Sequence, residues 1–420
     1  MEKILREYKK IPSLLKLYLI LILLIRIFLL TQPSFKIDMN DWQAWAARLV
    51  DVGPLKFYTS NFFADYLPFY YLFLWVIAEI FSFIFGKAAI FSITFEIYIK
   101  VISNIFDILT AYTIFVIINK HSKKWATIGS LLYLINPSII FNSSVWGQID
   151  AIPTFLLTFS LYQLEEKKNI VRSLSASVLS FLIKPLNIAL FPLMLFRIIK
   201  NFSAQKILKA SGISLLMFFI VTIPFFPNNP IFGPFEHLLK SLNVYPYTSI
   251  NAYNFWALFG WWKQDSLQVF NLSYHLWGYI LFFLIVLTIF IPLFRKKSKS
   301  FIKLDYLIYT ILSFAFFLFL TRIHERHLFP VFALLIISAC IFKSRVLIAS
   351  YITLAIVNFI NLFYSYYYHN VIYNNPMAPK NILFDISSNY QLIFSVLSLI
   401  VFSIMLVVYF KNQRLFIKKK

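Results

Sequence analysis

Long apolar runs separated by short clusters of lysine and arginine recur along the whole chain, and this alternation limits the folds it can adopt. Each run is about as long as a helix that crosses a lipid bilayer, roughly 20 residues. Of the 420 residues, 60% are hydrophobic and only 13% are charged, so lipid must cover most of the surface. The sequence predicts an all-α integral membrane protein with one multi-spanning domain, residues 1–420.

The basic clusters indicate how the chain threads the membrane. Short loops rich in lysine and arginine stay in the cytoplasm, so we expect all seven clusters and both termini there, in a plasma-membrane protein. The net charge of +22 is divided among these clusters, which argues against a nucleic-acid partner. The clusters are Lys3 to Lys10, Lys120 to Lys124, Lys167 to Arg172, Arg197 to Lys209, Arg295 to Lys303, Lys343 to Arg345 and Lys411 to Lys420.

If all basic clusters lie in the cytoplasm, the chain must cross the membrane an even number of times between one cluster and the next. Counting the apolar runs on this basis predicts about twelve spans. The run 67–85 would make that number odd, so we expect it to lie along the outer interface. The predicted parts are a first outer loop (32–97), a core helical module (98–226), an outer loop (227–274) and C-terminal helices (275–420). The predicted spans are 12–31, 98–118, 125–141, 150–165, 171–187, 188–200, 210–226, 275–294, 302–320, 328–342, 345–365 and 390–410.

Most of the unusual polar residues then face outward, and the first are in "KIDMNDWQAW" (36–45). Apolar residues recur at helical spacing from Asp41 to Val50, which predicts a short amphipathic helix on the membrane surface. Asp41 would open this helix and Asp38 would precede it, so either carboxylate could cap its N-terminus. Asp65 precedes the helix expected over 67–85 and could cap that one. Alternatively, carboxylates framing a pocket could take the proton of a sugar hydroxyl.

The segment "RIHERHLFP" (322–330) carries two arginines and two histidines on the side where basic residues are rare. Long cationic side chains at span ends often only extend to the interface. An anionic ligand is the stronger explanation, because guanidinium groups match phosphate oxygens in pairs. We therefore expect Arg322, His324 and Arg326 to bind a lipid phosphate, with Lys184 as a second cation. His324 and His327 could instead ligate a metal with Glu325, which this spacing supports weakly.

Two further outer segments, "VWGQID" (145–150) and "TSINAYNFW" (248–256), combine aromatic rings with amides and a carboxylate. Aromatic residues are ordinary at a membrane interface, but that does not explain the amides. Such groups suit a sugar ring. We expect substrate contacts from Asp41, Tyr66, Trp146, Gln148, Asp150, Asn251 and Asn254.

The sequence disfavours two classes of protein, an enzyme that uses a soluble nucleotide sugar and a transporter with an acidic relay. With no P-loop or dinucleotide fingerprint and only 8 glycines, a soluble nucleotide-sugar donor is not expected. Glu96 and Asp107 are the main carboxylates within apolar runs, which is poor support for the acidic relay of a transporter.

Six segments taken together resemble a known superfamily. They are "DMNDWQAW", "ADYLPFYYLFLW", "NPSIIFNSSVWGQID", "KPLNIALFP", "SINAYNFW" and "RIHERHLFP". In this order, over residues 35–330, they resemble GT-C membrane glycosyltransferases, in particular prokaryotic proteins related to the GPI-anchor mannosyltransferases. They are also similar to the glucosyltransferases that extend dolichol-linked oligosaccharides.

The resemblance implies roles for the acidic residues. An aspartate seven residues before a tryptophan is the catalytic base in that superfamily, and Asp38 stands seven residues before Trp45. The second acidic motif, Asp-Tyr-Pro-Pro, is matched by Asp65 and Tyr66, with Leu67 in place of the first proline.

The resemblance also implies a site for the donor phosphate. The outer His-Glu-Arg/Lys motif is matched by His324, Glu325 and Arg326. The Lys-Pro-Gln motif is matched at Lys184 and Pro185 only.

The expected activity is therefore transfer, with inversion, of a sugar from a polyprenyl-phosphate carrier to a glycan or lipid-linked acceptor at the outer face. The resemblance favours mannose as the sugar. No cofactor is expected, because the leaving phosphodiester is already charged and fixed cations can stabilise it. A divalent ion shared by Asp38 and Asp65 is the less favoured variant. The alternative function is a flippase or transporter of lipid-linked sugars or polysaccharide.

Overall fold

The computed structural model describes residues 13–59, 61–294 and 302–418. Within these ranges the chain is almost wholly helical, and its one hairpin consists of β1 (Gln268–Val269) and β2 (Leu272–Ser273). Seven of the described helices are long and apolar enough to cross a membrane, or eight if one bent pair counts as a single span. The prediction of an all-α protein is confirmed, and the long apolar helices support a multi-pass membrane protein.

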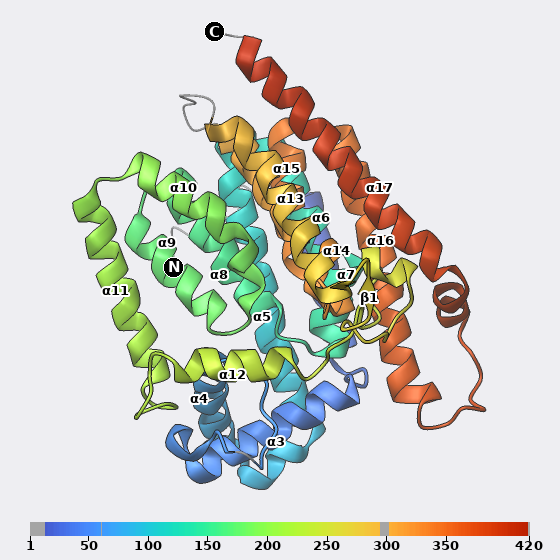
Figure 1. Cartoon of the computed structure of the whole chain (residues 1–420). Helices are drawn as coiled ribbons and strands as arrows, with labels where there is room; N and C mark the ends of the chain where they lie inside the picture. The colour runs from blue at the N-terminus through green and yellow to red at the C-terminus, as the bar shows by residue number, and fades with distance from the viewer. Residues whose placement is uncertain (1–12, 60, 295–301, 419–420) are drawn as a thin grey trace.

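Most helices follow one another with short connections, and the stretch between α12 and α13, residues 243–273, is longer (Figure 1). The α-helices are α2 (Ser13–Leu30), α3 (Lys36–Val52), α4 (Pro68–Phe85), α5 (Ile93–Asn119), α6 (Lys123–Leu134), α7 (Pro137–Ile140), α8 (Ala151–Leu161), α9 (Ile170–Phe181), α10 (Phe191–Asn201), α11 (Ala204–Thr222), α12 (Gly233–Leu242), α13 (Tyr274–Phe294), α14 (Ile302–Phe319), α15 (Phe329–Phe342), α16 (Arg345–Tyr367) and α17 (Ile382–Lys418).

Shorter 3₁₀ and π segments connect them: η1 (Pro54–Lys56), η2 (Lys87–Phe91), η3 (Phe141–Trp146), η4 (Tyr162–Glu166), η5 (Pro185–Leu190), η6 (Phe255–Leu258), η7 (Glu325–Leu328) and η8 (Tyr368–Ile372).

The count of twelve spans is not confirmed. Helices α8, α9 and α10 have 11, 12 and 11 residues, so each rises only about 17 Å, which is short of a hydrocarbon core of about 30 Å. Helix α4, predicted to lie along the interface, is among the seven that could span by length and composition. The basic clusters at Lys3 to Lys10 and, in large part, Arg295 to Lys303 lie outside the described residues, as do residues 1–12 and 419–420 of the two termini.

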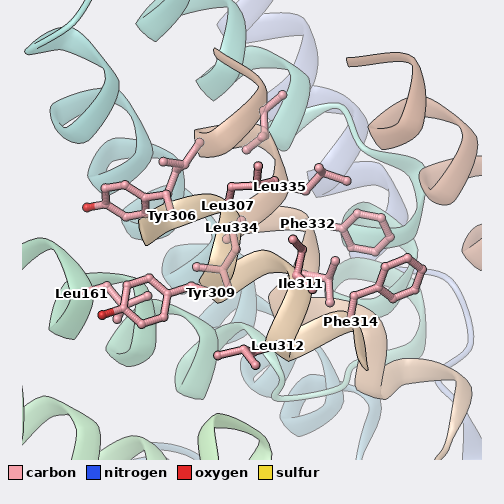
Figure 2. Packing of buried hydrophobic residues seen from close by; sticks show 14 of the residues in the cluster. Leu161, Tyr306, Leu307, Tyr309, Ile311, Leu312, Phe314, Phe332, Leu334 and Leu335 are labelled. Atoms are coloured by element: carbon pink, nitrogen blue, oxygen red, sulfur yellow. The ribbon is translucent and has the colours of Figure 1, made fainter. Parts of the chain in front are cut away.

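The hydrophobic core is centred on α14 and α15, as Figure 2 shows. Helix α15 is apolar all round, and every residue from Phe329 to Ile341 is buried. A helix with no polar face must be surrounded by other helices or by lipid. Here the neighbours are chiefly α14, α16 and α6.

One bend in the chain matters for the site. Helix α6 and the segment formed by α7 and η3 (Pro137–Trp146) are bent by 46° across Ile135 and Asn136. Pro137 cannot donate a backbone hydrogen bond to the preceding turn, so the helix breaks and restarts there. The Asn136 side chain caps the new start by accepting from the backbone N–H of Ser138 at 2.9 Å.

Helices α3, α4 and α12 form a cap at one end of the long helices, with α12 running crosswise between the other two and the bundle (Figure 1). A separate aromatic core holds α3 on α4, and it includes Trp42, Trp45, Tyr70 and Tyr71. The tryptophan face of α3 is thus buried against protein, whereas the sequence had suggested a helix resting on lipid. Helix α3 also begins at Lys36, five residues earlier than predicted.

Candidate active site

Asp38 lies in the first turn of α3, where two side chains from a distant segment hold its carboxylate. Trp146 donates its indole N–H to Oδ2 at 2.8 Å, and Gln148 donates its amide to the same oxygen at 2.6 Å. These donors are 108 and 110 residues away in the chain. Because both bonds go to Oδ2, the orientation of the carboxylate is fixed while Oδ1 stays outside these two contacts.

The backbone around residue 147 explains how both donors reach one oxygen. The π-helix η3 ends at Trp146, and Gly147 follows with φ 84° and ψ 19°, the left-handed region. Glycine adopts this conformation without strain. A Cβ at this position would also lie 3.0 Å from Cε of Met39. The left-handed backbone therefore favours a glycine at position 147, and this turn sets the relative positions of Trp146 and Gln148.

Gln148 connects Asp38 to a buried cation. Its carbonyl oxygen accepts from Nζ of Lys184 at 3.1 Å, and Lys184 also pairs with Asp150 at 2.5 Å. The Lys184 ammonium lies 4.9 Å from the centre of the Tyr66 ring, whose hydroxyl reaches Gln148 at 3.4 Å. We call Asp38, Trp146, Gln148, Asp150 and Lys184 the Asp38 network.

Arg326, in the turn η7, adds a second cation beside this network. Its guanidinium lies 5.9 Å from the Trp146 ring centre, contacts Glu325 at 3.4 Å and donates to Nδ1 of His324 at 3.2 Å. Burial, together with the charge of Arg326, holds the pKa of His324 well below its usual range. His324 is therefore neutral, with Nδ1 as acceptor and its proton on Nε2. Among the described residues none is in position to accept from the buried Nε of Arg326.

A cavity of about 310 Å³ adjoins these cations. One end of it is polar and includes Asp65, Tyr66, Lys184, His324, Arg326 and His327. Its other walls are largely apolar and come from residues in or next to η5, α12 and α14, namely Ile183, Pro185, Leu186, Ile188, Leu238, Leu242, Phe316 and Leu320. Asp38 does not line this cavity itself, and it is connected to it through Gln148 and Tyr66. The shape suits an amphiphilic molecule with an anionic head.

Asp41 and Asp65 lie near Asp38 but play no capping role. The N-cap of α3 is Phe35 and that of α4 is Leu67, and neither helix start has a side-chain cap. The predicted caps are therefore wrong, because α3 begins where Phe35 N–H bonds the carbonyl of Trp146.

The surroundings of these two carboxyls change their acidity. Burial, then the charges of Asp65 and Asp38, raise the pKa of Asp41 to about 7. Burial and the charge of Asp38 raise the pKa of Asp65 to about 6, against the opposing effect of the nearby cations. A set of three carboxyls thus carries less than three full charges at neutral pH.

Arg322 has contacts that differ from those expected of a phosphate-binding residue. Its Nε donates to Asp265 at 2.7 Å, and its Nη1 donates to Asn243 at 2.7 Å and to the Leu242 carbonyl at 3.1 Å. Arg322 lines the cavity, but its guanidinium is occupied. It joins the loop after α12 to the turn that carries Arg326.

Asn251 and Asn254 are buried, but they do not join the Asp38 network. Asn251 accepts from the Trp262 indole at 2.8 Å and bridges to His324 through the backbone. Asn254 caps η6 by accepting from Ala257 N–H at 3.1 Å. Both amides organise the loop that carries them, and contact with substrate remains only a prediction for these two residues.

Sequence reasoning did not single out several residues of the cavity, among them Ser241, Tyr245, His275 and Tyr279. Of these four, only His275 gave a signal in the sequence, because it is a histidine at the start of the span predicted over 275–294. Within the described ranges, no group of three or more His, Cys, Asp or Glu side chains is arranged to hold a metal ion.

No protein-family model matches the chain, and a search of curated proteins found no match either. Any assignment of function therefore depends on the site geometry and on the motifs that carry the resemblance.

Proposed function

We propose that this protein is an inverting GT-C type glycosyltransferase that takes its sugar from a polyprenyl-phosphate carrier. One observation carries the proposal: a single cavity joins a cationic end, at Lys184 and Arg326, to apolar walls, and Gln148 links that end to the carboxylate of Asp38. A phosphate with a long apolar tail matches the cavity, and an oriented carboxylate beside it provides a base.

In this proposal the cap faces the extracytoplasmic side and α4 does not cross the membrane. Tyr66, just before α4, contacts Gln148, and Ser34 in the connection between α2 and α3 donates to Glu96 near the start of α5 at 2.5 Å. The segment η2, which follows α4, packs on α3. Both ends of α4 thus adjoin the elements around α3, which favours a helix at the interface, as the charge pattern predicted.

The proposed reaction is a single displacement at the anomeric carbon. Asp38 accepts the proton of the acceptor hydroxyl while that oxygen forms a bond to the anomeric carbon. The bond from this carbon to the phosphate oxygen breaks, and polyprenyl phosphate leaves with the electron pair. Attack and departure on opposite faces invert the configuration.

The cations then have a definite task. The leaving phosphate gains negative charge as the bond breaks, and fixed donors at Arg326 and His324 stabilise it without reorganisation. Lys184 contributes less, because Asp150 already pairs with it. The aromatic rings of Tyr66 and Trp146 beside the cations provide faces on which a sugar can stack.

Purified full-length protein, incubated with radiolabelled polyprenyl-phosphate mannose and membrane extract, tests the proposal. We expect label to move from the carrier to a new product, and Asp38→Asn to abolish most of this transfer. Label that stays on the carrier but crosses sealed vesicles would instead support the flippase. Loss of transfer in chelator, restored by added divalent ion, would support an ion shared by Asp38 and Asp65.

A further inference from the structure

Helix α16 and the π-helix η8 that continues it have no part in the proposed mechanism, yet they hold several segments of the candidate active site. The motifs that carry the resemblance end at residue 330, so the sequence predicts no role for residues 345–372. Three asparagines of this element, Asn358, Asn361 and Asn370, bond to the backbone of three different segments. The identity of these segments indicates what α16 does.

Asn370 holds the start of α3. Its Nδ2 donates to the carbonyl of Ser34 at 2.8 Å, and its Oδ1 accepts from the backbone N–H of Lys36 at 3.1 Å. Lys36 is the first residue of α3, and Asp38 lies in its first turn. The two bonds therefore fix the stretch of backbone from which the carboxylate of Asp38 projects.

The same part of α16 packs on the aromatic rings beside Asp38. Phe35 stacks on Trp146 with ring centroids 4.2 Å apart, and Trp146 donates to Asp38. Leu362 of α16 belongs to the buried cluster that contains both rings, and the His369 ring of η8 meets Phe35 edge-on at 5.6 Å. Helix α16 and η8 thus support both the helix start that carries the carboxylate and the indole that orients it.

Asn358, earlier on the same helix, holds the turn with the cations. It is buried, and its Nδ2 donates to the carbonyl of Glu325 at 2.8 Å. This carbonyl belongs to the peptide bond that joins Glu325 to Arg326 in η7. The bond therefore fixes the backbone from which the guanidinium of Arg326 reaches the cavity.

Asn361 makes the same kind of contact with a third segment. Its Nδ2 donates to the carbonyl of Asn251 at 2.6 Å, and its Oδ1 accepts from the backbone N–H of Tyr253 at 3.1 Å. Asn251 in turn pairs through its backbone with His324. This asparagine therefore supports the cationic turn from its other side.

The reaction proposed above requires a constant separation between base and leaving group. The acceptor hydroxyl must lie between Asp38 and the anomeric carbon while the phosphate departs toward Arg326, and small errors in this alignment slow such a reaction strongly. Asn358 and Asn370 lie on one continuous helical element, roughly 18 Å apart along its axis at the rise of an α-helix. Groups held by one helix keep their spacing more precisely than groups held by separate loops.

We propose that α16 and η8 set the separation between the base and the cations of the site, with Asn370 positioning Asp38 and Asn358 positioning Arg326. This inference rests on the proposed function, since it assumes sugar transfer between these two groups. Both asparagines act through the backbone of another segment, so they are positioning residues and not catalytic ones.

Steady-state sugar transfer by the purified full-length protein tests the inference, with labelled polyprenyl-phosphate mannose as donor and membrane extract as acceptor. Asn370→Ala should lower kcat about tenfold or more and leave KM for the donor within about twofold, because the base is misplaced while the donor cavity is unchanged. Asn358→Ala should raise KM for the donor about fivefold, because the turn that carries Arg326 loses a hydrogen bond. A purely structural role would change neither constant per folded molecule.

Two further variants complete the design. Tyr366→Phe removes the hydroxyl that donates to the carbonyl of Pro33 at 2.8 Å and keeps the ring, so it loosens the chain before α3 without a cavity. It should lower kcat about two- to threefold at constant KM, and it tests the base end even if Asn370→Ala does not fold. Asn169→Ala is the control. Asn169 caps α9 by accepting from the backbone N–H of Arg172 at 3.1 Å and does not line the cavity, so only stability should change.

The outcomes separate the inference from the proposed function. A lower kcat at the Asn370 end together with a higher donor KM at the Asn358 end supports positioning by α16. If the wild-type protein transfers sugar but either alanine variant keeps both constants per folded molecule, or both variants change only the same constant, the inference is wrong and the proposed function stands. If the wild-type protein transfers no sugar, both fail. Unfolding temperatures identify any loss that comes from misfolding.

Discussion

Two regions of this molecule bury opposite charges between helices. In the Asp38 network, Lys184 pairs with Asp150. In the second region, which we call the Arg26 network, Arg26 of α2 donates to Asp107 and Asn104 of α5, at 2.7 Å each. It also donates to the carbonyl of Leu134, at 3.0 Å.

The two regions differ in what surrounds the charges. The partners of Arg26 lie on two neighbouring helices, α5 and α6, and neither Arg26 nor Asp107 lines the cavity. The Asp38 network adjoins that cavity, the second cation at Arg326 and the further carboxyls of Asp41 and Asp65. Burial of charge by itself thus does not identify a functional site. Access to a cavity distinguishes the Asp38 network.

The largest expected effect is on turnover at Asp38. Asp38→Asn should lower the rate of sugar transfer by about 10²- to 10⁴-fold, because the general base is lost, while the protein stays folded and binds donor. Transfer of labelled sugar per mole of folded protein measures the change. Asp41→Asn is the matched control and should keep most of the activity. Transfer by Asp38→Asn at a rate near wild type would rule out the proposed base.

The Arg26 network should respond in stability instead. Asp107→Leu leaves the Arg26 charge buried without a counter-charge, which we expect to cost about 3–5 kcal/mol and to lower the unfolding temperature sharply. Transfer per folded molecule should stay near wild type. The double variant Arg26→Met with Asp107→Leu replaces the pair by apolar groups and should recover much of the stability. An Asp107→Leu protein that is stable but inactive would mean that the Arg26 network takes part in sugar transfer.

Arg322 and Arg326, four residues apart, allow the same comparison between a stabilising and a ligand-binding charge within one turn. Arg326→Gln should weaken donor-lipid binding by about tenfold or more, since a charged hydrogen-bond donor to phosphate is lost. Arg322→Gln should mainly lower the unfolding temperature, because Arg322 holds Asp265 and Asn243. Equal losses of lipid affinity in both variants would mean that Arg322 leaves Asp265 to bind the ligand.

The same pair shows how far the sequence could predict this site. Spacing and the outer location singled out both arginines, but Asp265, which decides between them, is 57 residues from Arg322. Likewise, Asp38 could be proposed from its local motif, whereas its bond to Gln148 spans 110 residues. Contacts at such separation depend on tertiary packing and leave no periodic signal in a sequence.

The fold was predictable to a similar extent. Runs of Leu, Ile and Phe correctly indicated the long helices, since lipid and the core both require apolar faces. The lengths of α8 and α9 were not predictable, because α8 passes into the π-helix η4 and α9 ends just before the buried Lys184. The start of α3 was placed too late because Phe35 is held by Trp146 through the backbone.

The smallest expected effect distinguishes Asp41 from Asp38 by pH. Because its pKa in the folded protein is about 7, well above the usual 3.8, Asp41 holds its proton in the native state over a range where the unfolded chain has lost it. Its contribution to stability is therefore present at low pH and lost as the pH rises through 7. Asp41→Asn should raise the unfolding temperature by a few degrees at pH 8 and hardly at pH 5. An equal rise in unfolding temperature at pH 5 and pH 8 would mean that the raised pKa of Asp41 is not the cause.

The order in which the site residues occur along the chain has a consequence for biosynthesis. Asp38 belongs to the first helix after α2, and Arg326 directly precedes α15, so most of the chain must be synthesised before the site can close. Until then Asp38, Asp150 and Lys184 belong to segments that have not met. Loop closure over such separations is slow compared with local helix formation. Nascent chains arrested before residue 326 should therefore contain inserted helices and no donor-binding site, so that substrate lipid can associate only with a nearly finished polypeptide.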